Sequence, residues 1–244
     1  MTDLARRLFA EFTGTALLVA VVVGSGIAAE QLSPGDVGLQ LLENSLATVF
    51  GLATLILLFG PVSGAHFNPV VSLADWFLGR RDGTGLTLPE TGAYAFAQCT
   101  GGIAGAVVAN LMFDVETALS AKDRATGPHL LAEVVATASL VALIFALVRT
   151  GRATLAAPAV GAYIGAAYWF TSSTSFANPA VTVGRIFSDT FAGIAPGSAP
   201  PFILAQVAGA AVGVLLVLVL YPEPSGEAAP TSTSRVPGEL DRDA

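Results

Sequence analysis

The chain has 244 residues, of which 53% are hydrophobic and only 12% are charged. Because soluble domains carry about 25% charged residues, this composition excludes an ordinary soluble protein and predicts one embedded in the lipid bilayer. Much of the net charge of −7 comes from carboxylates in loops and in the C-terminal tail, and we expect no nucleic-acid partner. The single cysteine, Cys99, cannot form a disulfide within the chain.

Six apolar stretches are long enough to span the hydrocarbon layer, which takes about 20 helical residues. They are residues 8–29, 39–60, 89–113, 130–148, 153–170 and 200–221. We therefore predict an all-α membrane protein whose channel domain covers residues 1–222. The segment 223–244 is rich in proline, serine and glutamate and has no apolar period, so we expect a disordered cytoplasmic tail.

Two Asn-Pro pairs interrupt this series of spans, at Asn68-Pro69 and at Asn178-Pro179. Asparagine is a favoured helix N-cap, and proline suits the first helical position. The pairs therefore predict two short helices that begin at Pro69 and Pro179. Irregular backbone at membrane depth persists only where protein buries it or where it lines a wet cavity. Two such breaks predict a pore.

The two halves of the chain repeat each other. Glu11 of the first span is matched by Glu133 of the fourth, and Gln98 of the third by Gln206 of the sixth. The repeats cover about residues 8–113 and 130–221. Because each holds three spans, the second must be inverted in the membrane, and the two short helices then meet near the midplane. Small residues at these positions would allow close helix packing: Gly101, Gly102, Gly105, Gly209, Ala210 and Gly213.

Arginines mark one side of the predicted membrane topology. With six spans, the following all fall on the same side: Arg6, Arg7, Arg80, Arg81, Arg149, Arg152, Arg235 and Arg242. Positively charged loops remain on the cytoplasmic side of a membrane. We therefore expect a multi-pass protein of the cell membrane with both termini in the cytoplasm.

These motifs, in this order, closely resemble the major intrinsic protein family, the aquaporins and glycerol facilitators. The resemblance covers residues from about 8 to 221. It implies a right-handed bundle of six spans and two half-helices, assembled as a homotetramer with one pore in each subunit. It implies no cofactor and no metal.

The paired asparagines would form the centre of the pore. Asn68 and Asn178 can each cap a half-helix through the side-chain carbonyl and offer an NH₂ donor to a passing oxygen. The positive ends of the two helix dipoles would repel cations, including hydronium. Backbone carbonyls of the preceding loops would form acceptor ladders towards this point, from Gly64, Ala65, His66, Ser173, Thr174 and Ser175.

Glu11 and Glu133 are the charged residues deepest within the spans. A carboxylate inside the membrane is a candidate for proton relay. The resemblance instead implies that both accept hydrogen bonds from loop N–H groups and brace the half-helix loops, and we favour this role. For His66 we similarly favour donation to backbone over pH gating.

The outer filter departs from the family pattern. The family normally has arginine directly after the second Asn-Pro-Ala, whereas this chain has Val181. The other three filter positions, transferred by spacing from the asparagines, fall on Thr48, Ala166 and Ser175. Such a filter is wide and uncharged. Arg185 follows one helical turn later, on a similar face; we expect it at the membrane interface, although partial replacement of the missing charge is open.

We therefore predict a passive channel for uncharged solutes larger than water, such as glycerol, urea or metalloid hydroxides like arsenite. A water-selective channel is the nearest alternative. A coupled transporter would share inverted repeats and broken helices but would need a coupling site, and Glu11 and Glu133 are the only carboxylates deep in the spans. No nucleophile–base pair, metal-ligand set or phosphate loop is visible, so we do not expect an enzyme.

Overall fold

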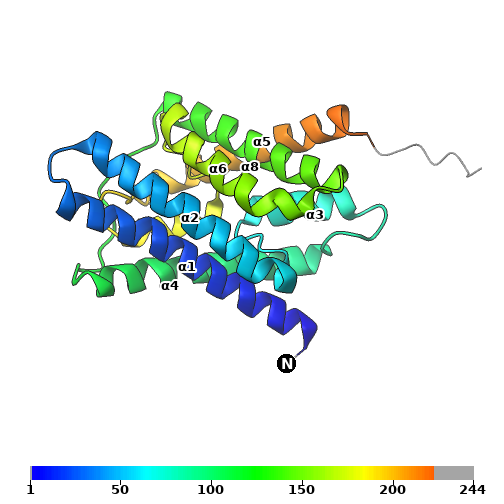
Figure 1. The fold of residues 1–244 in the computed structure, drawn as a ribbon, viewed down its shortest axis with the longest axis horizontal. Coiled ribbons are helices and arrows are strands. Elements are labelled where there is room, and N and C mark those ends of the chain that lie inside the picture. Colours follow the sequence, from blue (N-terminus) through cyan, green and yellow to red (C-terminus); the bar gives the residue numbers. More distant parts are fainter. Residues whose placement is uncertain (1, 223–244) are drawn as a thin grey trace, which may run out of the picture.

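A computed structural model describes residues 2–222, and the predicted tail, with Arg235 and Arg242, lies outside the described residues. Long helices run side by side along the longest axis of the molecule (Figure 1). Five of them are long and apolar enough to cross a membrane. They are α1 (Asp3–Leu32), α2 (Val37–Ser63), α4 (Leu88–Met112), α5 (Gly127–Arg149) and α8 (Ala199–Leu220).

The remaining predicted span, 153–170, is helical but not one continuous α-helix. It begins with a 3₁₀ turn, η1 (Ala153–Leu155), and continues as α6 (Ala156–Phe170), which has 15 residues. Pro158 lies in the first turn of α6, where its missing N–H leaves no helical hydrogen bond unmade. The bundle therefore contains the six expected apolar segments, one of them shorter than predicted.

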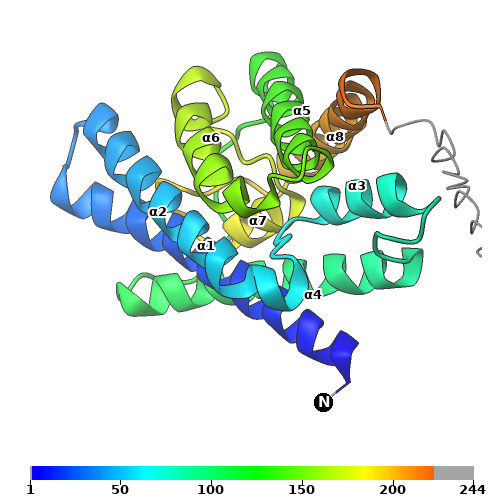
Figure 2. The same cartoon turned by 45° about the vertical axis from the view of Figure 1, so that its right-hand side comes forward.

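Both short helices begin at the predicted prolines. Helix α3 (Pro69–Gly79) has 11 residues, whereas α7 (Pro179–Gly184) has only 6 and continues as a 3₁₀ turn, η2 (Arg185–Phe187). Figure 2 shows α7 in the middle of the bundle and α3 extending outward beside it, between α4 and α8. The second half-helix is thus shorter than the first, although both start at the predicted position.

Glycines allow α4 and α8 to lie directly against α1 and α5. A Cβ atom at Gly101 would be 2.3 Å from the Phe12 carbonyl oxygen, and one at Gly209 would be 2.6 Å from the Val134 carbonyl oxygen. One turn further along, a Cβ at Gly105 would lie 2.1 Å from the carbonyl oxygen of Ala16. Equivalent helices of the two halves therefore pack in the same way, as the repeat predicted.

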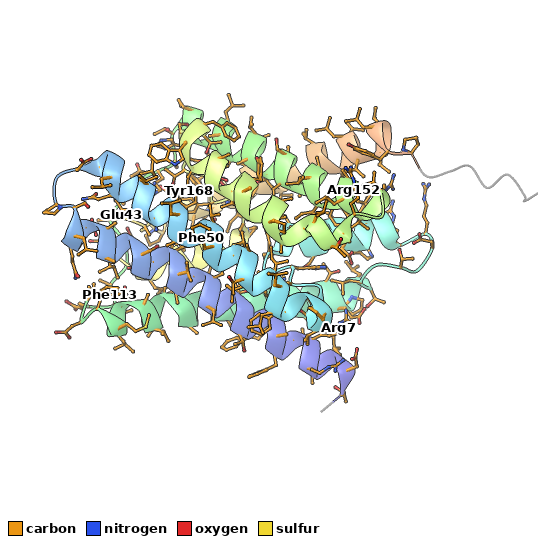
Figure 3. The ribbon with its side chains drawn as sticks, viewed as in Figure 1. Arg7, Glu43, Phe50, Phe113, Arg152 and Tyr168 are labelled. Carbon is orange, nitrogen blue, oxygen red and sulfur yellow. The ribbon has the colours of Figure 1, made fainter. Side chains whose placement is uncertain are left out.

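Charged side chains lie at both ends of the bundle. Arg7 and Arg152 lie at one end, and Glu43 lies at the other (Figure 3). Between the ends, the outward surface carries large apolar side chains, among them Phe50, which is 67% exposed, and Leu204, which is 71% exposed. This is the surface expected where lipid surrounds a helical bundle.

Candidate pore and selectivity filter

A cavity of about 710 Å³ runs through the middle of the bundle. At one end it is bordered by Ala153 and Thr154, which follow α5. It passes Asn68 and Asn178 and is bordered further on by Thr48 and Tyr168. Figure 3 shows Tyr168 towards the end of the bundle that holds Glu43, opposite Arg152. The cavity therefore follows the direction in which the long helices run.

The two asparagines hold the half-helices together across the centre of this cavity. Asn68 Nδ2 donates to the carbonyl oxygen of Ala177 at 2.8 Å, and Asn178 Nδ2 donates to that of Phe67 at 2.8 Å. Each side-chain oxygen caps its own helix, Asn68 through the N–H of Val70. A primary amide has two N–H donors. One donor of each amide is used by the opposite loop, and the other is available on the cavity side.

The loops before the asparagines have the same unusual backbone. Ala65 and Phe67 have φ of 50°, and Ser175 and Ala177 have φ of 51° and 47°. Non-glycine residues rarely adopt positive φ, and such strain persists only where the surroundings enforce it. The same residues relative to each asparagine carry the strain in both halves. The two loops are therefore built alike, although their sequences differ.

Glu11 enforces this conformation in the first loop. Its Oε1 accepts from Ser63 Oγ at 2.6 Å and from the His66 N–H at 3.0 Å. Its Oε2 accepts from the Phe67 N–H at 2.7 Å and from Gln98 Nε2 at 2.7 Å. The carboxylate is fully buried, so these four donors replace its hydration. It braces the loop in the way the resemblance implied.

Glu133 makes the same four bonds in the second loop. Its Oε1 accepts from Ser173 Oγ at 2.6 Å and from the Phe176 N–H at 2.9 Å. Its Oε2 accepts from the Ala177 N–H at 2.8 Å and from Gln206 Nε2 at 2.7 Å. Because each acceptor oxygen already serves two donors, neither carboxylate is arranged as a proton relay.

The sequence prediction missed the two serines in these networks. Ser63 and Ser173 each lie five residues before an asparagine of the Asn-Pro pairs. That shared spacing is a signal that would have identified them as partners of the glutamates. Ser173 uses its side chain in this way, and neither it nor Thr174 borders the cavity, whereas Gly64, Ala65, His66 and Ser175 do.

His66 forms a hydrogen bond with a side chain, whereas we expected it to donate to backbone. Its Nδ1 lies 3.0 Å from Ser72 Oγ, one turn into α3. The same hydroxyl accepts from Gln98 Nε2 at 3.1 Å. His66 is thereby tied to the network that also holds Glu11.

Three of the predicted filter residues border the cavity together. Thr48, Ser175 and Val181 are all buried, and all three line it. Ser175 Oγ is buried and has no hydrogen-bond partner among residues 2–222. It is therefore a polar group available to a passing solute. Val181 contributes only a small apolar surface.

Ala166 was the wrong choice for the fourth position. It lies on the exposed face of α6 and does not border the cavity. The cavity side of α6 is formed by Val160, Ile164 and Tyr168, which are four residues apart and share one helix face. The position was transferred only by its spacing from Asn178, which does not determine which face of α6 it lies on. Tyr168 borders the cavity instead, with its hydroxyl 3.1 Å from Thr48 Oγ1.

Arg185 also lies where we did not expect it. Its side chain is buried, with 2% exposed, and it borders the cavity. The guanidinium lies over the ring of Phe176, 3.4 Å from the ring centroid. Its Nε donates to the carbonyl oxygen of Ala192. The expectation that Arg185 would point to the membrane interface is therefore wrong.

Comparison with known proteins agrees with this geometry. The family model described as Major intrinsic protein matches residues 1–176. The chain belongs to this family. Among major intrinsic proteins, it is 49% identical over 217 residues to the aquaglyceroporin AqpS of Rhizobium meliloti (strain 1021), covering 88% of this chain and 90% of that protein.

Two further comparisons extend the likeness within the major intrinsic protein family. The chain is 31% identical over 240 residues to a glycerol uptake facilitator protein of Pseudomonas aeruginosa, covering 86% of this chain and 85% of the relative. The solved structure of the aquaglyceroporin from Plasmodium falciparum superimposes with a TM-score of 0.62 at 22% identity, covering 90% of this chain and 96% of that chain. At that identity the superposition shows the shared fold.

Proposed function

We propose that this protein is a passive channel through which small uncharged solutes cross the membrane, with glycerol, urea, water and metalloid hydroxides as candidates. The observation that carries the proposal is the cavity bordered by Asn68 and Asn178, each with one amide N–H committed to the opposite loop. The uncommitted N–H groups give a permeating hydroxyl or water two fixed donors at one point. The 49% identity to an aquaglyceroporin supports the same reading.

The filter that we propose consists of Thr48, Tyr168, Ser175 and Val181, with carbonyls of Gly64, Ala65 and His66 on the other side of the asparagines. Hydroxyls on three of the four residues suit polyols and amides, which both donate and accept hydrogen bonds. No carboxylate lies among the four, so selection would depend on size and hydrogen bonding.

The position of Tyr168 is also compatible with the water-selective alternative. Its ring occupies the position that we had assigned to alanine, and its hydroxyl reaches Thr48 across the end of the cavity. A ring there makes the filter narrower than the sequence predicted. Glycerol flux therefore decides between the two channel types.

The remaining assignments follow from the family and the arginine pattern. We infer a homotetramer in the cell membrane, with both termini and the Arg7 end of the bundle in the cytoplasm. Membership of the major intrinsic protein family agrees with our expectation that the chain is not an enzyme.

The test is stopped-flow light scattering on proteoliposomes, which records shrinkage in sucrose and re-swelling in glycerol or urea. We expect wild type to pass water and glycerol, without the saturable counterflow of a transporter. Val181→Arg should slow glycerol, whereas Val181→Met, which adds bulk without charge, should slow it less. Passage of water alone by wild type would support the water-selective alternative, and saturable counterflow would contradict a channel.

A further inference from the structure

Two arginines contact Phe176, which belongs to the loop of residues 171–178 between α6 and α7, here called the filter loop. Arg185 belongs to η2, and Arg124 belongs to the segment between α4 and α5. The Cζ atom of Arg185 is 3.4 Å from the centroid of the Phe176 ring, and that of Arg124 is 5.3 Å away. Stacking of this kind is favourable for guanidinium groups and is stronger where water is excluded.

One short segment accepts hydrogen bonds from both guanidinium groups. Arg124 donates through Nε to the carbonyl oxygen of Gly193 at 2.7 Å and through Nη2 to that of Phe191 at 3.0 Å. The carbonyl between them, that of Ala192, accepts from Arg185 Nε. Three successive carbonyls thus point at two cations. The side chain of Arg185 is held by this segment and by Phe176, and it cannot swing towards lipid without breaking these contacts.

Neither arginine forms an ion pair with a carboxylate in the described part of the chain, although the charge of Glu133 acts on both. Within residues 2–222 the ion pairs are Arg6 with Asp3 and Arg7 with Glu90. Burial lowers the pKa of Arg124 to about 10, so this group still carries its charge at neutral pH. Carbonyl dipoles and an aromatic ring stabilise the charges without cancelling them. A buried, unpaired charge is costly, and inside a membrane protein it marks a functional position.

We propose that Arg185 is the cation barrier of this pore, displaced by one helical turn from Val181 and held in place by Phe176 and the segment 191–193. The inference rests on the proposed channel function. Separating the charge from the filter position leaves Val181 free to admit bulky neutral solutes, while the positive potential still acts on the same cavity. A pore with this arrangement admits larger uncharged solutes without admitting sodium, potassium or protons.

The test removes the charge of Arg185 in the full-length protein and measures ions and glycerol in the same proteoliposomes. Arg185→Met and Arg185→Gln remove the charge, and Gln keeps a donor for the Ala192 carbonyl. Arg185→Lys keeps the charge. Lys122→Met is the matched control, because Lys122 donates to the Phe191 carbonyl at 3.0 Å but does not border the cavity. Potassium flux is followed with a potential-sensitive dye and proton flux with an entrapped pH dye.

We expect cation flux to rise about tenfold or more in both neutral variants, since a loss of about 1.4 kcal/mol from the barrier gives that factor. Wild type, Arg185→Lys and Lys122→Met should remain tight to cations. The deciding measurement is the cation flux of a neutral variant that reconstitutes with glycerol flux. Cation flux at the wild-type level in that variant would overturn the inference. Absence of both water and glycerol flux in wild type would instead overturn the proposed channel function.

Discussion

Replacing Glu133 by glutamine should destabilise the protein and disturb the pore, because the change reverses the hydrogen-bond polarity of one group. The carboxylate accepts four bonds, two on each oxygen. Glutamine can accept on one atom only, and its NH₂ group would face the Ala177 N–H and the Gln206 amide. The Gln206 amide can turn round and accept, whereas the backbone N–H of Ala177 cannot.

The magnitude follows from these bonds. A buried N–H left without a partner costs about 1–3 kcal/mol, and bonds to a neutral acceptor contribute about 1 kcal/mol less than bonds to a charged one. One orphaned N–H and three weakened bonds therefore amount to about 4–6 kcal/mol. At about 2–4 °C per kcal/mol for a domain of this size, the unfolding midpoint should fall by about 10 °C or more. Glycerol flux should fall as well, since Ala177 directly precedes Asn178.

The assay is thermal unfolding of the purified protein in detergent, together with proteoliposome re-swelling. Glu43→Gln is the matched control, because one oxygen of Glu43 accepts from Ser33 Oγ at 2.7 Å and the other has no partner among residues 2–222. Glu11→Gln should behave like Glu133→Gln, since its bonds are the same. A shift for Glu133→Gln no larger than that for Glu43→Gln, with flux unchanged, would refute the bracing role.

Two further substitutions test packing and the filter. Gly105→Ala should lower stability by about 1–3 kcal/mol through overpacking against the Ala16 carbonyl, whereas Gly92→Ala, where a Cβ meets nothing within 4 Å, should be neutral or stabilising; equal unfolding midpoints for the two would contradict close α1–α4 packing. Tyr168→Ala should raise glycerol flux several-fold more than Tyr168→Phe, which keeps the ring; equal rates in both would show that the ring does not limit passage.

The centre of the pore could be predicted from the sequence because its determinants are local. An asparagine followed by proline fixes a helix start wherever it occurs, and the repeated Glu11 and Glu133 identified the braces. The short helices begin at Pro69 and Pro179 as expected. The reciprocal bonds between the loops were not predicted, because the sequence indicated only that the two half-helices meet and that each asparagine offers an NH₂ donor.

The filter could be predicted only in part, because it depends on geometry across loops. Thr48, Ser175 and Val181 lie in or next to regular elements and were placed correctly at the cavity. The sequence does not show at which residue α6 ends and the loop before Asn178 begins. An error of two residues in counting back from Asn178 therefore moves the chosen position to the opposite side of the helix. Ala166 was therefore chosen where Tyr168 stands.

Arg185 could not be placed from sequence for a different reason. The groups that hold it inward come from segments before and after it, namely Phe176 in the filter loop and the carbonyl of Ala192. A lone arginine after a short apolar helix is typical of a membrane interface, and only the three-dimensional arrangement shows the alternative partners.

The most direct test of the account is chemical block of the cavity beside the asparagines. Val71 is 4% exposed and borders the cavity from α3, and Cys99, which is half-buried on α4, does not border it. After treatment with a small neutral methanethiosulfonate, glycerol flux should be lost in Val71→Cys and unchanged in wild type, whose Cys99 is the internal control. Full modification of the introduced thiol, confirmed by mass, with undiminished glycerol flux would contradict a pathway between Asn68 and Asn178.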